Sequence, residues 1–262
     1  MCTVVILRRP EHDWPVLIAA NRDEMNDRPW SAPARHWEDR DHVVAGRDDL
    51  AGGTWMGLND FGVTACILNR MHTLGPADGK RSRGELPLEA LDHAEARVAA
   101  DAIADIEPTS YRAFNMLIAD ALGAYWLTST GEPGTSVRLV EIPSGLSMIT
   151  AHDMNDIETS GRTRAYLPRF RAAPAPDPDA ETKHGTGDWF AWESLLASRL
   201  HDPDEGPGGA MCVVTDSGFQ TVSSSLIGLR AAGSTLGPAS LRAIWRFCPG
   251  RPDMERFAAL AL

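Results

Sequence analysis

The N-terminal stretch limits the possible folds most, because two apolar runs follow each other with one short polar loop between them. The first run begins at the thiol residue Cys2 and is rich in β-branched side chains. The second ends in the tetrapeptide Asn21-Arg22-Asp23-Glu24. Runs of this kind predict two antiparallel strands, at residues 2–8 and 15–21. The predicted hairpin therefore begins with a nucleophile and ends with a cation and carboxylates.

A cysteine at position 2 has a specific chemical consequence. Its small side chain allows methionine aminopeptidase to remove Met1, which would leave a free α-amine on Cys2. An amine with a pKa near ~8 beside a thiol with a pKa near ~8.5 is a nucleophile that carries its own base. Position alone does not decide the role, because a cysteine also occurs there by chance as an ordinary first residue of a strand.

Length, composition and charge place the chain in a broad class. The 262 residues are 43% hydrophobic and 23% charged, which is typical of a globular protein, and we expect one domain over residues 1–262. The net charge of −11 argues against unspecific binding to nucleic acid or to anionic membranes. No apolar run is long enough to predict an integral membrane segment.

The cysteines and histidines predict neither a disulfide framework nor a metal site. The four cysteines are far apart, without a CxxC pair, and the histidines lack the HxxxH and HExxH spacings. We therefore expect no cofactor, no metal and a reducing, cytoplasmic location without a signal peptide. The cysteines are Cys2, Cys66, Cys212 and Cys248.

A second hairpin is predicted at residues 52–59 and 63–69, around the turn Asp60-Phe61-Gly62. Two glycines, Gly52 and Gly53, open its first strand. Glycine in a strand marks either a bend with a close approach of another group or tight packing against a neighbouring tryptophan. The sequence favours neither explanation.

The rest of the chain mixes strands with helices. Clustered hairpins with helices inserted between them predict an α+β protein rather than the alternating order of a doubly wound sheet. Four arginines lie in one predicted helix, at 162, 164, 169 and 171, which is more typical of a solvated helix face than of an anion site. The predicted elements are a helix at 88–106, a hairpin at 114–120 and 124–128, two strands at 137–142 and 146–150, a helix at 159–172 and a terminal helix at 254–262.

Eight short blocks in order resemble the NRDE family, which is named for the tetrapeptide at 21–24 and includes the eukaryotic transport and Golgi organisation protein 2. The match is dense over residues 1–86. The blocks are Met1-Cys2-Thr3, Asn21-Arg22-Asp23-Glu24, Arg28-Pro29, Trp37, Ala45-Gly46-Arg47-Asp48, Gly52-Gly53-Thr54-Trp55-Met56-Gly57, Leu68-Asn69-Arg70 and Arg81-Ser82-Arg83-Gly84-Glu85.

The resemblance implies an N-terminal nucleophile hydrolase fold, a four-layer αββα sandwich of two antiparallel sheets. The first seventy residues are also similar to the bile-salt hydrolase and penicillin V acylase group. By this resemblance Cys2 is the nucleophile, and its α-amine acts as base and then as acid. Arg22 stabilises the thiolate or orients the substrate, and Asp23 holds the amine. Asn69, together with a backbone N–H group, stabilises the oxyanion.

The resemblance leaves some positions open. Arg22 and Asp23 point to opposite faces of a regular strand, so Glu24 is an alternative to Asp23 as the carboxylate of the site. Without the resemblance, these three residues would be interpreted as a cluster of salt bridges.

The substrate side of the expected site is less well defined. Trp55, Asn155 and Arg230 are the expected substrate-binding residues, with Asn155 and Arg230 standing for an asparagine and an arginine of the acylase group. Trp55, together with Trp30 and Trp37, could line an apolar pocket, although tryptophans are more often part of a core.

Two functions remain open at this point. The first is a cysteine N-terminal nucleophile amidohydrolase that cleaves a non-peptide C–N bond of a small substrate. The alternative is a non-catalytic haem or lipid binding or trafficking protein on the same fold. The partner is accordingly a small-molecule amide or an apolar ligand. An enzyme needs the free α-amine of Cys2, whereas a carrier should tolerate retained Met1 or Cys2→Ala.

Overall fold

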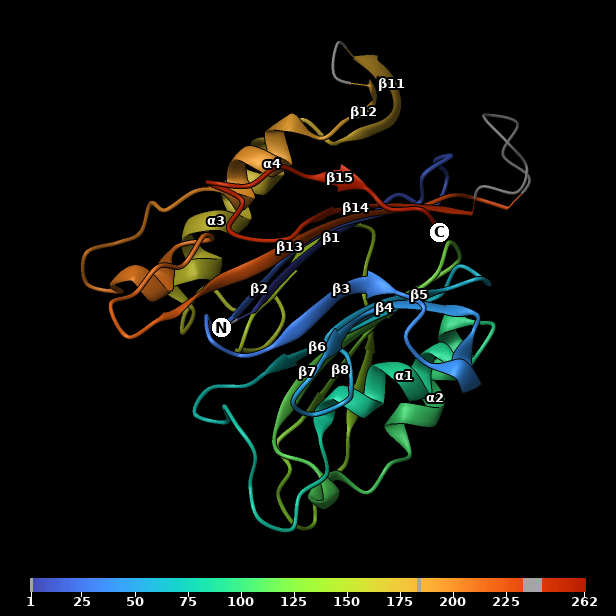
Figure 1. Cartoon of the computed structure of the whole chain (residues 1–262), viewed down its shortest axis with the longest axis vertical. Coiled ribbons are helices and arrows are strands. Elements are labelled where there is room, and N and C mark those ends of the chain that lie inside the picture. Colours follow the sequence, from blue (N-terminus) through green and yellow to red (C-terminus); the bar gives the residue numbers. More distant parts are fainter. Residues whose placement is uncertain (1, 183–184, 233–241) are drawn as a thin grey trace.

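Two antiparallel sheets lie face to face in the computed structural model, and helices cover the outer face of each (Figure 1). The structure describes residues 2–182, 185–232 and 242–262. Helices α1 (Leu86–Leu91) and α2 (Ala96–Ala104) cover one sheet, and α3 (Gly161–Ala172) and α4 (Phe190–Leu196) cover the other. This αββα order of layers confirms the predicted fold class.

The sheet that contains the N-terminal hairpin has the strand order β10-β1-β2-β13-β14-β15. Strands β1 and β2 pair as predicted, with Thr3 opposite Asn21, and β13 pairs with the other edge of β2. The strands are β10 (Gly145–Ile149), β1 (Thr3–Arg8), β2 (Val16–Met25), β13 (Phe219–Leu229), β14 (Ala243–Cys248) and β15 (Ala258–Ala259).

The second sheet runs in chain order from β3 to β9. It contains the predicted glycine-rich hairpin as β5 and β6, with Met56 opposite Cys66. Its strands are β3 (Trp30–Ala34), β4 (Val43–Asp48), β5 (Met56–Asn59), β6 (Thr64–Asn69), β7 (Phe114–Ala119), β8 (Ala124–Ser129) and β9 (Arg138–Glu141), and a separate hairpin is formed by β11 (Asp177–Thr182) and β12 (Gly185–Asp188).

Short 3₁₀ turns connect several of these elements. They are η1 (Glu38–Arg40), η2 (Arg83–Glu85), η3 (Pro108–Ser110) and η4 (Pro207–Gly209). No helix in the described part of the chain is both long and apolar enough to cross a bilayer.

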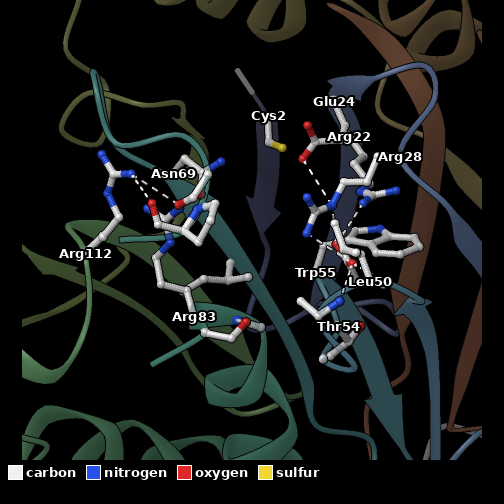
Figure 2. Close-up of a pocket in the computed structure, with 18 of the residues that line it drawn as sticks. Cys2, Arg22, Glu24, Arg28, Leu50, Thr54, Trp55, Asn69, Arg83 and Arg112 are labelled. Carbon is white, nitrogen blue, oxygen red and sulfur yellow. Dashed lines mark hydrogen bonds and ion pairs between the residues drawn. The ribbon is translucent and has the colours of Figure 1, made fainter. Parts of the chain in front are cut away.

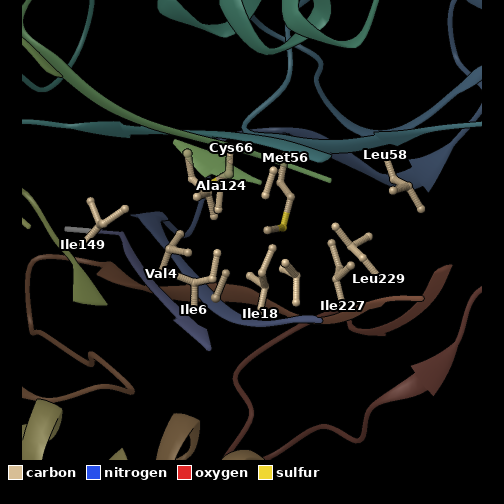
Figure 3. Packing of buried hydrophobic residues seen from close by; sticks show 14 of the residues in the cluster. Val4, Ile6, Ile18, Met56, Leu58, Cys66, Ala124, Ile149, Ile227 and Leu229 are labelled. Carbon is tan, nitrogen blue, oxygen red and sulfur yellow. The ribbon is translucent and has the colours of Figure 1, made fainter. Parts of the chain in front are cut away.

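The central core lies between the two sheets (Figure 3). Val4 and Ile6 of β1 and Ile18 of β2 contribute to it from one side, and Met56 and Cys66 from the other. Because side chains alternate along a strand, the odd-numbered residues of β1 and β2 face α3 and α4 instead. This alternation determines on which side of the sheet each residue of the N-terminal motif lies.

The structure corrects three predictions about individual elements. The helix expected at 88–106 is two helices, because the Asn59 side chain donates to the carbonyls of Leu91 and His93, and Asp120 accepts from the first N–H of α2, that of Ala96. The strands at 137–142 and 146–150 exist as β9 and β10 but belong to different sheets. The terminal helix at 254–262 is wrong, because β15 pairs with β14 there.

Candidate active site

A cavity of about 370 Å³ lies where β1 begins (Figure 2). Seven of the eight blocks that carry the family resemblance contribute to its lining, and only the Trp37 block does not. The lining residues are Cys2, Arg22, Asp23, Glu24, Arg28, Asp48, Leu50, Ala51, Gly53, Thr54, Trp55, Ile67, Asn69, Gly75, Pro76, Ala77, Lys80, Arg81, Ser82, Arg83, Gly84 and Arg112.

Cys2 precedes β1 and lies on the inner face of the sheet, because it packs against the core that Val4 and Ile6 enter. The half-buried thiol donates a long hydrogen bond of 3.7 Å to the carbonyl of Asp23. Burial raises the pKa of the Cys2 thiol, and the charge of Asp23 raises it further, while Arg22 acts in the opposite direction. A thiol in this state requires a base before it can attack a carbonyl group.

Arg22 lies on the same inner face and is almost completely buried, with 6% of its side chain exposed. Its guanidinium stacks 4.1 Å from the ring centroid of Trp55, and its Nη2 lies 3.4 Å from Oδ2 of Asp48. Among the described residues no group accepts from its Nη1. A buried cation with an unused donor is therefore available beside Cys2.

Trp55, one of the residues that the sequence predicts to bind substrate, forms a wall of the cavity. Gly46 leaves the space for its ring, since a Cβ on Gly46 would lie 2.3 Å from Trp55. Trp30 packs edge-on behind Trp55 with 5.8 Å between the ring centroids, and Trp37 packs against the core beneath α1 and α2. Of the three tryptophans considered from the sequence, Trp55 lines the cavity.

The Asp23 carboxylate lies on the outer face, away from the Cys2 thiol. It forms an ion pair of 2.9 Å with Arg162 of α3 and accepts a hydrogen bond of 2.7 Å from Thr221. The same guanidinium donates to the Thr3 hydroxyl, so Asp23 is held beside the start of β1. The prediction of a solvated helix face is thus wrong for Arg162, which is buried, although Arg164, Arg169 and Arg171 are largely exposed.

Glu24, the alternative carboxylate, returns to the inner face with Arg22. Its Oε2 lies 3.8 Å from Nε of Arg28. Arg28 also binds Asp48 through two hydrogen bonds, of 2.7 and 3.2 Å. Glu24 is therefore part of a charge cluster at the cavity wall, whereas Asp23 belongs to the layer behind the sheet.

Asn69 ends β6 and lines the cavity on the side away from Trp55, with Cys2 between them in the view of Figure 2. The sequence therefore identified four residues that meet at one place, namely Cys2, Arg22, Trp55 and Asn69. An amide side chain and a thiol that line the same cavity can act together on one carbonyl group, the thiol as nucleophile and the amide as hydrogen-bond donor.

Asn155 and Arg230 lie outside this cavity. Asn155 has a φ of 60° and exchanges hydrogen bonds with Met148, so its side chain closes a turn after β10. Arg230 follows β13, where it stacks 4.5 Å from the Trp14 ring and pairs with Asp179. Ser223 of β13 is paired with Arg22, and Arg230 follows Ser223 by seven residues. At the rise of an extended strand, Arg230 is therefore roughly 20 Å from Arg22 and the cavity.

Sequence reasoning missed the cations that line the other side of the cavity, which are Lys80, Arg81, Arg83 and Arg112. Arg81 and Arg83 lie within one of the family blocks, which was the only available signal. Gly53 and Gly84 bring this block to the cavity, because a Cβ on Gly53 would lie 2.5 Å from the Gly84 backbone. A glycine is thus required at position 53 because another backbone segment approaches it closely. Packing against a tryptophan requires a glycine at position 46 and not at position 53.

No histidine lines this cavity, and within the described ranges no group of three or more His, Cys, Asp or Glu side chains is arranged to hold a metal ion.

Comparison with known proteins places these residues in a family context. The model of the Transport and Golgi organisation 2 family matches residues 1–160, which include the whole cavity lining. The chain belongs to this family. The mouse transport and Golgi organization 2 homolog is 32% identical over 108 residues, which are 40% of this chain and 38% of the mouse protein. The match thus spans well under half of that relative.

The fold of this family member matches solved structures of N-terminal nucleophile hydrolases. One is the Caenorhabditis elegans ortholog of N-acylethanolamine-hydrolyzing acid amidase, with a TM-score of 0.54 at 10% identity over 86% of this chain and 92% of that one. Another is a C2A mutant of conjugated bile acid hydrolase from Clostridium perfringens, with a TM-score of 0.50 at 11% identity over 100% of this chain and 97% of that one. At these identities the similarity concerns the fold.

Proposed function

We propose that this protein is a cysteine amidohydrolase that cleaves a non-peptide C–N bond of a small substrate through Cys2 after removal of Met1. The observation that carries the proposal is the position of the Cys2 thiol, at the first strand of the fold, inside a cavity, between Arg22 and Asn69. The amidase and bile acid hydrolase structures with the same fold support this reading. Met1 itself lies outside the described residues.

The first step is proton transfer from the thiol to the α-amine. Burial raises the thiol pKa, so little thiolate exists at neutral pH unless a base is at hand. The free amine of residue 2 would supply that base, with Asp23 behind the sheet to hold the resulting ammonium. Arg22 favours the thiolate through its charge.

The thiolate then forms a C–S bond with the amide carbon, and the carbonyl electron pair moves to oxygen. The Asn69 side chain would donate to this oxyanion, a contribution of roughly 3–4 kcal/mol in other acyl-transfer sites. The α-ammonium gives its proton to the departing nitrogen as the C–N bond breaks, which leaves a thioester on Cys2. Water, deprotonated by the same amine, then hydrolyses the thioester and restores the thiol.

Hydrolysis of an acyl p-nitroanilide by three forms of the protein tests the proposal. The form with Cys2 at its N-terminus should release p-nitroaniline, whereas Cys2→Ala and a form with one extra residue before Cys2 should not. Cys66→Ala, which removes another thiol of the inner layer, is the matched control and should retain activity. Equal release by the extended form would contradict a role for the α-amine.

The alternative of a haem or lipid carrier makes the opposite prediction for the same variants. A carrier needs neither the thiol nor the amine, so haemin or a fatty acid should bind equally well to the protein and to Cys2→Ala. Such binding, together with no hydrolysis of any amide by the processed form, would replace the enzyme proposal.

A further inference from the structure

Charge is distributed unevenly around the cavity. On the Trp55 side, two cations face two carboxylates, since Arg22 and Arg28 both contact Asp48 and Arg28 also approaches Glu24. The Nε–Oδ2 distance between Arg28 and Asp48 is 2.7 Å. The charges on this side therefore balance within the wall itself.

The Asn69 side has three cations with neutral partners only, and we call Lys80, Arg83 and Arg112 the basic side of the cavity (Figure 2 shows Arg83 and Arg112). Lys80 donates to a backbone carbonyl at 2.5 Å. Arg83 donates to Thr73 and to the Ala113 carbonyl.

Arg112 has the same kind of partners. It donates to the carbonyls of residues 72 and 74–76. Within the described ranges none of the three side chains forms an ion pair, although Glu107 lies within electrostatic reach of Lys80.

Arg83 lies close enough to Arg112 and to Cys2 for their charges to act on it. Burial lowers the pKa of Arg83 to about 10, and the like charge of Arg112 lowers it as well. The charges of Cys2 and Glu24 act on Arg83 in the opposite direction, which places it within electrostatic reach of both. An anion on the basic side would relieve this repulsion and would lie near Cys2.

Arg81 is the fourth cation of this side, and its ion pairs distinguish it from the other three. Arg81 also lines the cavity, but its charge is already compensated by Glu85 at 2.6 Å and Glu89 at 3.4 Å. More than half of its side chain is exposed. The excess positive charge therefore belongs to Lys80, Arg83 and Arg112, in a protein whose net charge is −11.

We propose that the cavity takes a small amide that also carries an anionic group, a carboxylate or a phosphate, which binds to the basic side while the amide carbonyl lies between Cys2 and Asn69. The amide part rests on the proposed function, whereas the anion site does not. Arginine and lysine side chains both bind carboxylates and phosphates, and the arginines supply forked donors for them. The local positive potential would also attract such a substrate towards a protein that is otherwise negative.

Calorimetric binding to Cys2→Ala tests the anion site without turnover. The probes are N-octanoyl-glycine, its neutral analogue N-octanoyl-glycinamide, and octyl phosphate. We expect at least one anion to bind about tenfold tighter than the glycinamide, and the tighter of the two identifies the preferred group. The preference should weaken when the salt concentration rises.

Variants of the cations locate the effect. In the Cys2→Ala protein, Lys80→Gln and Arg112→Gln should each remove most of the preference for the anion, whereas Arg81→Gln should leave it unchanged. Equal binding of all three probes, or an equal loss in Arg81→Gln, would overturn the proposal. Hydrolysis by the processed protein is a separate measurement, so an anion site without amidase activity, and amidase activity without an anion site, give distinct results.

Discussion

Arg162 of α3 and Asp23 of β2 form an ion pair of 2.9 Å in which both side chains are buried. The pair lies on the face of the sheet opposite the Cys2 thiol, and Arg162 also donates to Thr3 and to the Gly208 carbonyl. It thereby connects the helix layer to the first residues of β1. The side chains of the tetrapeptide at 21–24 thus lie on both faces of one sheet. Arg22 points towards the cavity, and Asp23 points towards α3.

Arg162→Met should destabilise the fold by about 3–5 kcal/mol, because it leaves the Asp23 carboxylate buried without this cation. The double variant Arg162→Met, Asp23→Asn should recover part of the loss. Urea unfolding measures both. Arg171→Met on the exposed part of the same helix should change the stability by less than about 0.5 kcal/mol. If Arg162→Met and Arg171→Met lowered the free energy of unfolding by similar amounts, the ion pair would have no special role in stability.

Labelling by a thiol reagent should select Cys2 and depend on Arg22. Burial raises the pKa of Cys212 to about 12 and that of Cys248 to about 11, and it raises the pKa of Cys66 as well. These three thiols are buried, whereas Cys2 is accessible from the cavity. The labelling rate of Cys2 should rise with pH, because its pKa is raised and the thiolate is the reactive form.

Arg22→Gln should move this rate profile to higher pH, since the lost cation favours the thiolate. Rates measured by mass spectrometry between neutral and alkaline pH decide the point. Arg81→Gln, whose charge is balanced by Glu85 and Glu89, is the control and should not move the profile. A shift of the Arg22→Gln profile to lower pH would refute the assigned role.

Asn69→Ala should lower kcat by roughly 10²–10³ and leave KM nearly unchanged, because an oxyanion donor acts mainly in the transition state. Steady-state kinetics on the p-nitroanilide substrate separates the two parameters. A rise in KM at constant kcat would instead make Asn69 a binding residue.

Gly53→Ala should cost about 1–3 kcal/mol, because its Cβ would meet the backbone of Gly84 at 2.5 Å and backbone atoms cannot move aside cheaply. Thermal or urea unfolding measures the loss. Gly208→Ala is the matched control, since no atom lies within 4 Å of the position of its added Cβ. An unaffected Gly53→Ala would mean that the two loops are not held together as described.

Local patterns predicted the paired strands well, because alternation and turn residues are properties of neighbouring positions. The hairpins β1–β2, β5–β6 and β7–β8 follow from such patterns. The assignment of β9 and β10 to different sheets does not, since their partners β8 and β1 are determined by tertiary packing.

The site could be predicted only where motif residues themselves line the cavity. Cys2, Arg22 and Asn69 belong to ordered blocks, and the fold brings these blocks together. Arg162 was missed because one buried arginine among three exposed ones leaves no periodic signal. Arg112 was missed because its partners are carbonyl groups of the distant segment 72–76, and backbone carbonyls carry no sequence signature.

The most direct test of the central claim is the intact mass of the purified protein before and after brief treatment with iodoacetamide at neutral pH. The account predicts a chain that lacks Met1 and gains one adduct, which disappears in Cys2→Ser. A chain that retains Met1, or one in which Cys66, Cys212 or Cys248 reacts as fast as Cys2, would contradict an N-terminal cysteine nucleophile.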